Sequence, residues 1–119
     1  MNQDFEELSK ATRELEALSL QLSRMVPRVA DARTVIDFDS DRKKSALSRA
    51  VLAAFKAGAS STSQAEHEAR GSKTFEADMK DLVTAYALAQ RVKTEYEVMQ
   101  IKIDTLRTLV SAQKSLMNL

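Results

Sequence analysis

The sequence contains no cysteine, no tryptophan, one proline and only two glycines among its 119 residues. Without cysteine the chain can form no disulfide, no thiolate metal site and no cysteine nucleophile. Glycine and proline average about 7% and 5% of residues in globular proteins, so this scarcity leaves too little turn chemistry for a fold with many strands. We therefore predict an all-α protein whose helices are joined by few loops.

The remaining composition suits a folded helical domain. Hydrophobic residues make up 44% of the chain, charged residues 29% and aromatic residues 5%. A chain of this length fits one domain, which we place at residues 1–119. Because aromatics are scarce, the core must consist of Leu, Ala, Val and Met, which pack well between helices.

Membrane signals are missing as well. No stretch approaches the ~20 apolar residues that a membrane span needs. The first residues, MNQDFEE, lack the basic segment and apolar run of a signal peptide. We expect no membrane partner and a cytoplasmic location.

Apolar residues at alternating intervals of three and four predict helices in the first half of the chain. The seam from Leu8 to Met25 is the clearest. Pro27 interrupts it, and proline either kinks a helix or starts a new one. The acidic run Asp37-x-Asp39-x-Asp41 is expected to precede and cap a further helix. The helices predicted here cover residues 4–26, 28–37 and 40–57.

Two glycines and a serine-rich segment mark the only clear loop region. Gly58 is expected to close the third helix in the left-handed conformation that glycine adopts cheaply. Ser63 and Glu66 form a capping-box pair that opens a short helix over 63–70, which Gly71 ends.

The dominant feature is a long C-terminal helix, predicted over residues 73–117, a segment without glycine or proline. At 1.5 Å per residue it would be roughly 65 Å long. Its apolar alternation breaks between Ala89 and Val92, which divides it into two contact zones. The fold class is thus an elongated all-α hairpin or bundle with coiled-coil-like packing.

The Leu8–Met25 helix could cover only about half of this long helix. The rest must meet the Leu47–Phe55 helix, another copy of the chain or a different protein. We expect a homo-oligomer, because a long amphipathic helix in a small chain buries its excess stripe in a symmetric partner. The residues assigned to this interface are Tyr96, Met99, Ile103, Leu106 and Val110.

Catalytic motifs are lacking. His67 is the only histidine, and its sequence neighbours Glu66 and Glu68 point in other directions on a helix. The three aspartates at 37, 39 and 41 resemble the start of a calcium loop, but the required glycine and final carboxylate are missing. We predict no enzyme, no catalytic residue, no metal and no cofactor.

One charge pattern points to a different function. Between Arg42 and Ala65 there are five basic residues and no acidic one. Arg42, Arg49 and Lys56 are seven apart, so on a helix they form one basic stripe suited to phosphate groups. An ordinary solvated helix face is the alternative. The candidate nucleic-acid or anion-binding residues are Arg42, Lys43, Lys44, Arg49 and Lys56.

Several stretches between residues 42 and 117 share an alanine-rich helical spacing. They are Lys44-Ser-Ala-Leu-Ser-Arg-Ala-Val-Leu, Ala65-Glu66 and Ala69-Arg70, Tyr86-x-x-Ala89, and Tyr96-Glu97 followed by Lys102-Ile103-Asp104-x-Leu106-Arg107. Through these stretches the segment resembles small helical proteins encoded by tailed phages and prophages. The resemblance implies an accessory role in phage recombination or replication in the bacterial host cell, and it brings no functional residues with it.

Three hypotheses follow for function. The first is a non-enzymatic helical oligomerisation protein that assists DNA recombination or replication by binding DNA or a partner enzyme. The second is a small inhibitor that binds a host defence protein. The third is a helix-turn-helix DNA-binding regulator, in which helix 63–70 would read DNA although Glu66 and Glu68 repel phosphates.

Overall fold

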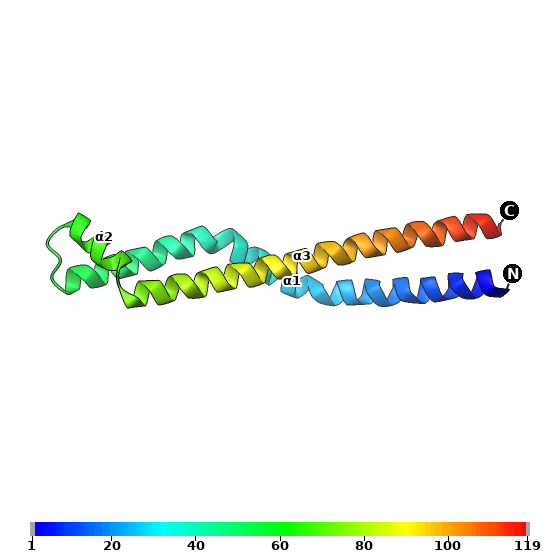
Figure 1. Cartoon of the computed structure of the whole chain (residues 1–119), viewed down its shortest axis with the longest axis horizontal. Helices are drawn as coiled ribbons and strands as arrows, with labels where there is room; N and C mark the ends of the chain where they lie inside the picture. Colours follow the sequence, from blue (N-terminus) through cyan, green and yellow to red (C-terminus); the bar gives the residue numbers. More distant parts are fainter. Residues whose placement is uncertain (1, 119) are drawn as a thin grey trace. The chain divides into compact units, whose positions relative to one another are not determined.

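The computed structural model describes residues 2–118, and all regular secondary structure in this range is helical. Three helices follow one another: α1 (Asn2–Lys56), α2 (Thr62–Arg70) and α3 (Lys73–Met117) (Figure 1). The all-α prediction is confirmed, and so are the bounds of the long C-terminal helix, 73–117. Among residues 2–118, none of the helices contains an apolar stretch that could span a bilayer.

The helices form two compact units. Among the described residues, unit 1 combines residues 2–30 of α1 with residues 92–118, which contain the second half of α3, and unit 2 is Asp31–Arg91. On α3 the division falls between Arg91 and Val92, where the sequence predicts a change of contact zone.

The prediction of three separate helices before Gly58 is wrong, because α1 continues for 55 residues through Pro27. Proline inside a helix removes one hydrogen bond, which costs about 3 kcal/mol. Pro27 is exposed, so water can satisfy the carbonyl that loses its partner, while Met25 and Val29 on either side of it are buried. Packing of the apolar seam thus outweighs the lost bond.

The acidic run at 37–41 does not cap a helix either. It lies inside α1, where the Asp39 carboxylate pairs with Lys43 Nζ one turn later at 2.9 Å. Aspartates two residues apart point to different sides of a helix, so the three carboxylates cannot converge on one ion. The interpretation of this run as a helix start is corrected.

Gly58 ends α1 as the sequence predicts. Its φ is +113°, and a hydrogen bond joins its N–H to the Phe55 carbonyl at 3.1 Å. The Ala59 N–H donates to the Ala54 carbonyl, also at 3.1 Å. These two bonds form a Schellman motif, which requires a residue with positive φ.

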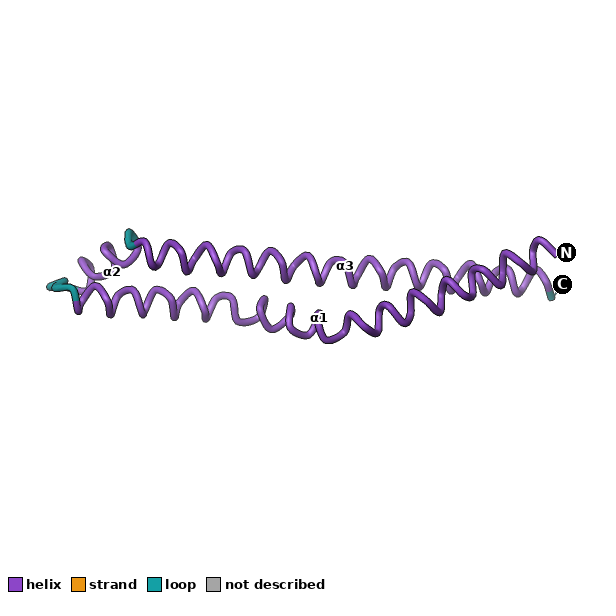
Figure 2. The backbone as a smooth tube through the Cα atoms, turned by 90° about the horizontal axis from the view of Figure 1, so that it is seen from below, coloured by secondary structure: helices purple, strands orange, loops and turns teal. Residues whose placement is uncertain are grey.

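The start of α2 differs from the prediction by one residue in its bounds and by two in its cap. Ser61, not Ser63, is the cap: its Oγ accepts the Gln64 N–H at 3.1 Å. Both serines fit the capping-box pattern, because Gln64 and Glu66 each follow three residues later. The end at Gly71 is confirmed. Short loops flank α2 on both sides, drawn in teal in Figure 2.

In unit 1 the two helical segments lie side by side and run antiparallel, as both views show (Figures 1 and 2). Met25 and Val29 of α1 and three residues of α3 are buried there. Half-buried leucines of α1, from Leu8 to Leu22, extend this packing toward the N-terminus. The buried residues of α3 in unit 1 are Val92, Ile103 and Val110.

Unit 2 has a core of a different kind, since every buried hydrophobic residue in it is alanine. Small side chains let helix axes approach closely. Ala65 and Ala69, four residues apart on α2, are almost fully buried, so α2 packs one face onto this unit. The buried residues are Ala32, Ala46, Ala54, Ala65, Ala69 and Ala89.

Candidate interaction surfaces

Two of the five predicted basic residues lie together at an open groove. Arg42 and Arg49 line an open groove in unit 2, together with Ser45 between them on α1. Asp78 and Asp81 of α3 line the same groove. We call this site, which has a volume of about 510 Å³, the arginine groove. Its lining residues are Phe38, Asp41, Arg42, Ser45, Arg49, Asp78, Asp81 and Leu82.

The charges of the arginine groove oppose each other. Two guanidinium groups, from Arg42 and Arg49, share it with the carboxylates of Asp41, Asp78 and Asp81. A polyanion entering the groove would meet three like charges for two opposite ones. Sequence patterns could not predict this opposition of charges, because Asp78 and Asp81 lie more than 25 residues from the two arginines and line the groove only through the fold.

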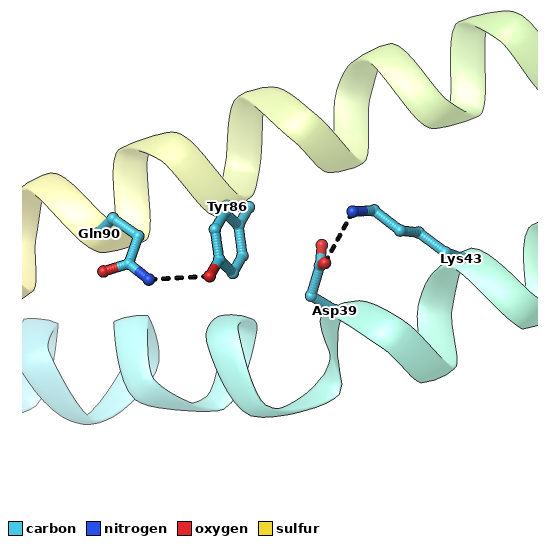
Figure 3. A network of polar contacts seen from close by, with 4 residues as sticks. All are labelled: Asp39, Lys43, Tyr86 and Gln90. Carbon is cyan, nitrogen blue, oxygen red and sulfur yellow. Dashed lines mark hydrogen bonds and ion pairs between the residues drawn. The ribbon is translucent and has the colours of Figure 1, made fainter.

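Lys43 turns away from the basic stripe and is engaged inside unit 2. Its Nζ lies 2.9 Å from Asp39 Oδ2 and 5.9 Å from the centre of the Tyr86 ring (Figure 3). The Tyr86 hydroxyl in turn accepts a hydrogen bond from Gln90 Nε2 at 2.9 Å. The Lys43 ammonium group therefore contacts Asp39 on α1 and the Tyr86 ring on α3, and these contacts stabilise the packing of the two helices in unit 2.

The other two basic candidates, Lys44 and Lys56, do not line the arginine groove. Lys44 is exposed and does not line the arginine groove. Lys56 is the last residue of α1, where a positive charge favours the helix dipole. Lys56 stays seven residues from Arg49 on the same helix but is not among the residues that line the arginine groove.

The residues assigned to an oligomer interface lie on the face of α3 that packs inside unit 1. We call them the packed stripe: Tyr96, Met99, Ile103, Leu106 and Val110. Ile103 is 2% exposed and Val110 6%, and the other three are half-buried. In unit 1 this face is covered by residues 2–30 of α1, which include the predicted Leu8–Met25 helix, so cover within the chain, and not a second copy, buries it.

A second apolar line runs along α3 within unit 1 and was missed. Its four large members are exposed: Val98 by 47%, Ile101 by 65%, Leu109 by 54% and Leu116 by 71%. Exposed Thr105 and Ala112 fill the gaps between them. We call this surface the outer stripe: Val98, Ile101, Thr105, Leu109, Ala112 and Leu116.

Helix geometry separates the two stripes. At about 100° per residue, the outer stripe is centred roughly 140° around α3 from the packed stripe. Its intervals are three or four residues throughout, so it spans about 27 Å along the helix. A repeat of eleven was the signal for it in the sequence: Val98 with Leu109, Ile101 with Ala112, and Thr105 with Leu116.

Charged residues flank the outer stripe differently on its two edges. Glu97 and Asp104, seven residues apart, lie on one edge, and Lys102 lies on the other with Glu95 two turns before it. Asp104 has Arg107 as a neighbour at 3.7 Å. Among the described residues, neither Glu97 nor Lys102 has an ion-pair partner.

The remaining candidate residues form no site with one another. His67 is exposed on α2, as are Glu66 and Glu68 beside it. Within residues 2–118 no group of three or more potential ligands could hold a metal ion. Comparison of the chain with protein-family models, with curated proteins and with solved structures gives no match.

Proposed function

We propose that this chain is a non-enzymatic helical protein that binds another protein chain through the outer stripe of α3. The observation that carries the proposal is a line of four large apolar side chains, each about half exposed or more, on a helix whose other face is already packed. Contiguous exposed apolar surface is typical of protein interaction sites. Burying the part of one such side chain that is still exposed contributes about 1–2 kcal/mol, so four of them together favour binding.

The accessory role in DNA recombination or replication belongs to the same proposal. A chain without catalytic groups can assist such a process by holding an enzyme or by holding copies of itself together. Inhibition of a host defence protein would use the same surface toward a different partner. Identification of the bound protein decides between the two.

The test compares two leucines that are equally exposed in unit 1. Leu109 in the outer stripe and Leu20 on α1 are each 54% exposed. Leu109→Glu should abolish binding of both a captured bacterial protein and further copies of the chain, whereas Leu20→Glu should leave both intact. Capture from extract is run with and without nuclease. Binding that Leu109→Glu does not weaken, or capture that nuclease abolishes, would overturn the proposal.

DNA binding is a second candidate, supported by one observation: Arg42 and Arg49 lie together in the arginine groove with Ser45 between them. Guanidinium groups about 10 Å apart along a helix could contact successive phosphates. The carboxylates of Asp78 and Asp81 in the same groove weaken this candidate.

A further inference from the structure

We propose that the occupant of the outer stripe is a second copy of this chain, paired in parallel so that α3 meets α3 across a two-fold axis. The inference rests on the proposed function and names its partner. It also replaces the interface predicted from the sequence: the packed stripe stays inside each chain, and the opposite face of the same helix joins two chains.

The spacing of the outer stripe suits helix pairing. An eleven-residue repeat corresponds to about 3.67 residues per turn, close to the 3.6 of a straight α-helix. Two such stripes stay in contact over their full length with little supercoiling. From Val98 to Leu116 the repeat covers 19 residues, close to the three heptads that make a helix pair persistent.

Small residues recur within the stripe. Thr105 lies near its middle and Ala112 one repeat after Ile101. They alternate with Val98, Leu109 and Leu116, so large side chains of one copy can enter the spaces beside small ones of the other. Such alternation lets helix axes approach to about 8–10 Å.

Charged residues at the edges of the outer stripe favour a parallel direction for the two α3 helices. In a parallel pair, the residue just before one core position faces the residue five places further along the other helix. Glu97 of one copy then faces Lys102 of the partner subunit, and symmetry repeats the contact. Neither side chain has an ion-pair partner among the described residues of its own chain, so both are available.

An antiparallel pair would bring like edges together. The edge that carries Glu97 and Asp104 would then face its own copy running in the opposite direction, so with the stripes fully overlapped these acids lie opposite Thr108, Ser111 and Ser115. No attractive contact between charges forms at this edge. Lys102 would lie on the far side of the pair from these acids. The charge pattern therefore favours the parallel arrangement.

Single cysteines can report the direction, because the chain has none of its own. In the parallel pair, Val98→Cys lies beside its own copy, so a short bismaleimide should join two chains of this variant. Ala112→Cys should behave alike. The control Leu20→Cys, exposed but off the stripe, should stay monomeric under the crosslinker. Crosslinking that appears only when Val98→Cys and Ala112→Cys are mixed would show antiparallel pairing and overturn the inference.

A charge exchange tests the specific contact. Glu97→Lys should raise the dimer dissociation constant roughly tenfold, since two attractive contacts become repulsive. Adding Lys102→Glu to the same chain should restore wild-type association. A double variant no tighter than Glu97→Lys alone would contradict the proposed pairing of edges.

The inference and the proposed function can fail separately. If sedimentation equilibrium shows only monomer at the highest attainable concentration, the second copy is not the occupant and the inference falls. The proposed function still holds in that case if Leu109→Glu abolishes capture of another protein. If Leu109→Glu changes neither self-association nor capture, both fall.

Discussion

Ile101 and Ile103 lie two residues apart on α3 and have opposite environments: Ile103 is 2% exposed and Ile101 is 65% exposed. Two residues correspond to about 200° around a helix, so the same side chain faces α1 at one position and solvent at the other. This pair shows that α3 is apolar on two sides, of which unit 1 covers one.

The two isoleucines should therefore differ sharply in their contribution to stability. Ile103→Ala should lower the free energy of unfolding by about 2–5 kcal/mol, because it leaves a cavity between α1 and α3. Ile101→Ala should change it by less than about 0.5 kcal/mol in dilute solution, where copies do not associate. Urea unfolding followed by circular dichroism measures both, and equal losses would contradict the assignment of faces.

The alanine core of unit 2 should not tolerate larger side chains. Ala46 is buried between helices, so Ala46→Leu should destabilise the protein by about 1–3 kcal/mol. Ala53→Leu, on an exposed position of the same helix, is the matched control and should be close to neutral. Thermal unfolding of the two variants tests this. A neutral Ala46→Leu would mean that the helices of unit 2 pack less closely than described.

The two glycines should respond in opposite directions to alanine. Gly58→Ala places a Cβ at φ +113°, which should cost about 1–2 kcal/mol even though no atom lies within 4 Å. Gly71 has φ −89°, and its added Cβ would lie 3.6 Å from the His67 carbonyl oxygen, an ordinary contact. Gly71→Ala should be neutral or stabilise by about 0.4–1 kcal/mol. Denaturant midpoints of both variants check this, and a neutral Gly58→Ala is the contrary result.

Removing the opposing carboxylates should reveal whether the arginine groove binds DNA. Asp78→Asn with Asp81→Asn should strengthen salt-sensitive DNA binding, since two repulsive charges leave the groove. Glu6→Gln with Glu7→Gln changes the net charge equally at exposed positions of unit 1 and serves as the control. Fluorescence anisotropy at two salt concentrations measures both. Equal gains would assign the effect to net charge and exclude the groove as a site.

Much of the fold can be predicted from the sequence. The long helix at 73–117, the turn at Gly58 and the end of α2 follow from local rules, because glycine and an uninterrupted apolar repeat act over a few residues. The continuation of α1 through Pro27 could not be predicted from the sequence. It depends on packing of Met25 and Val29 against α3, a tertiary effect that outweighs a local penalty.

The functional surfaces are harder to predict from the sequence, because they too depend on tertiary packing. The five residues of the packed stripe lie on one helix face, as the sequence predicts. The periodicity does not show that the Leu8–Met25 segment packs against this half of α3 and not against the other half, because that choice depends on tertiary pairing. The outer stripe was present as an eleven-residue repeat, yet Thr105 and Ala112 made it weaker than the packed stripe. That Arg42 and Asp78 line the same groove depends on the fold alone.

The central claim, that the outer stripe binds another chain, is tested most directly by sedimentation equilibrium on the wild type, Leu109→Glu and Leu20→Glu. The account predicts a reversible dimer for the wild type and for Leu20→Glu, and a monomer for Leu109→Glu that keeps its helical content. A Leu109→Glu variant that associates as tightly as the wild type would contradict it.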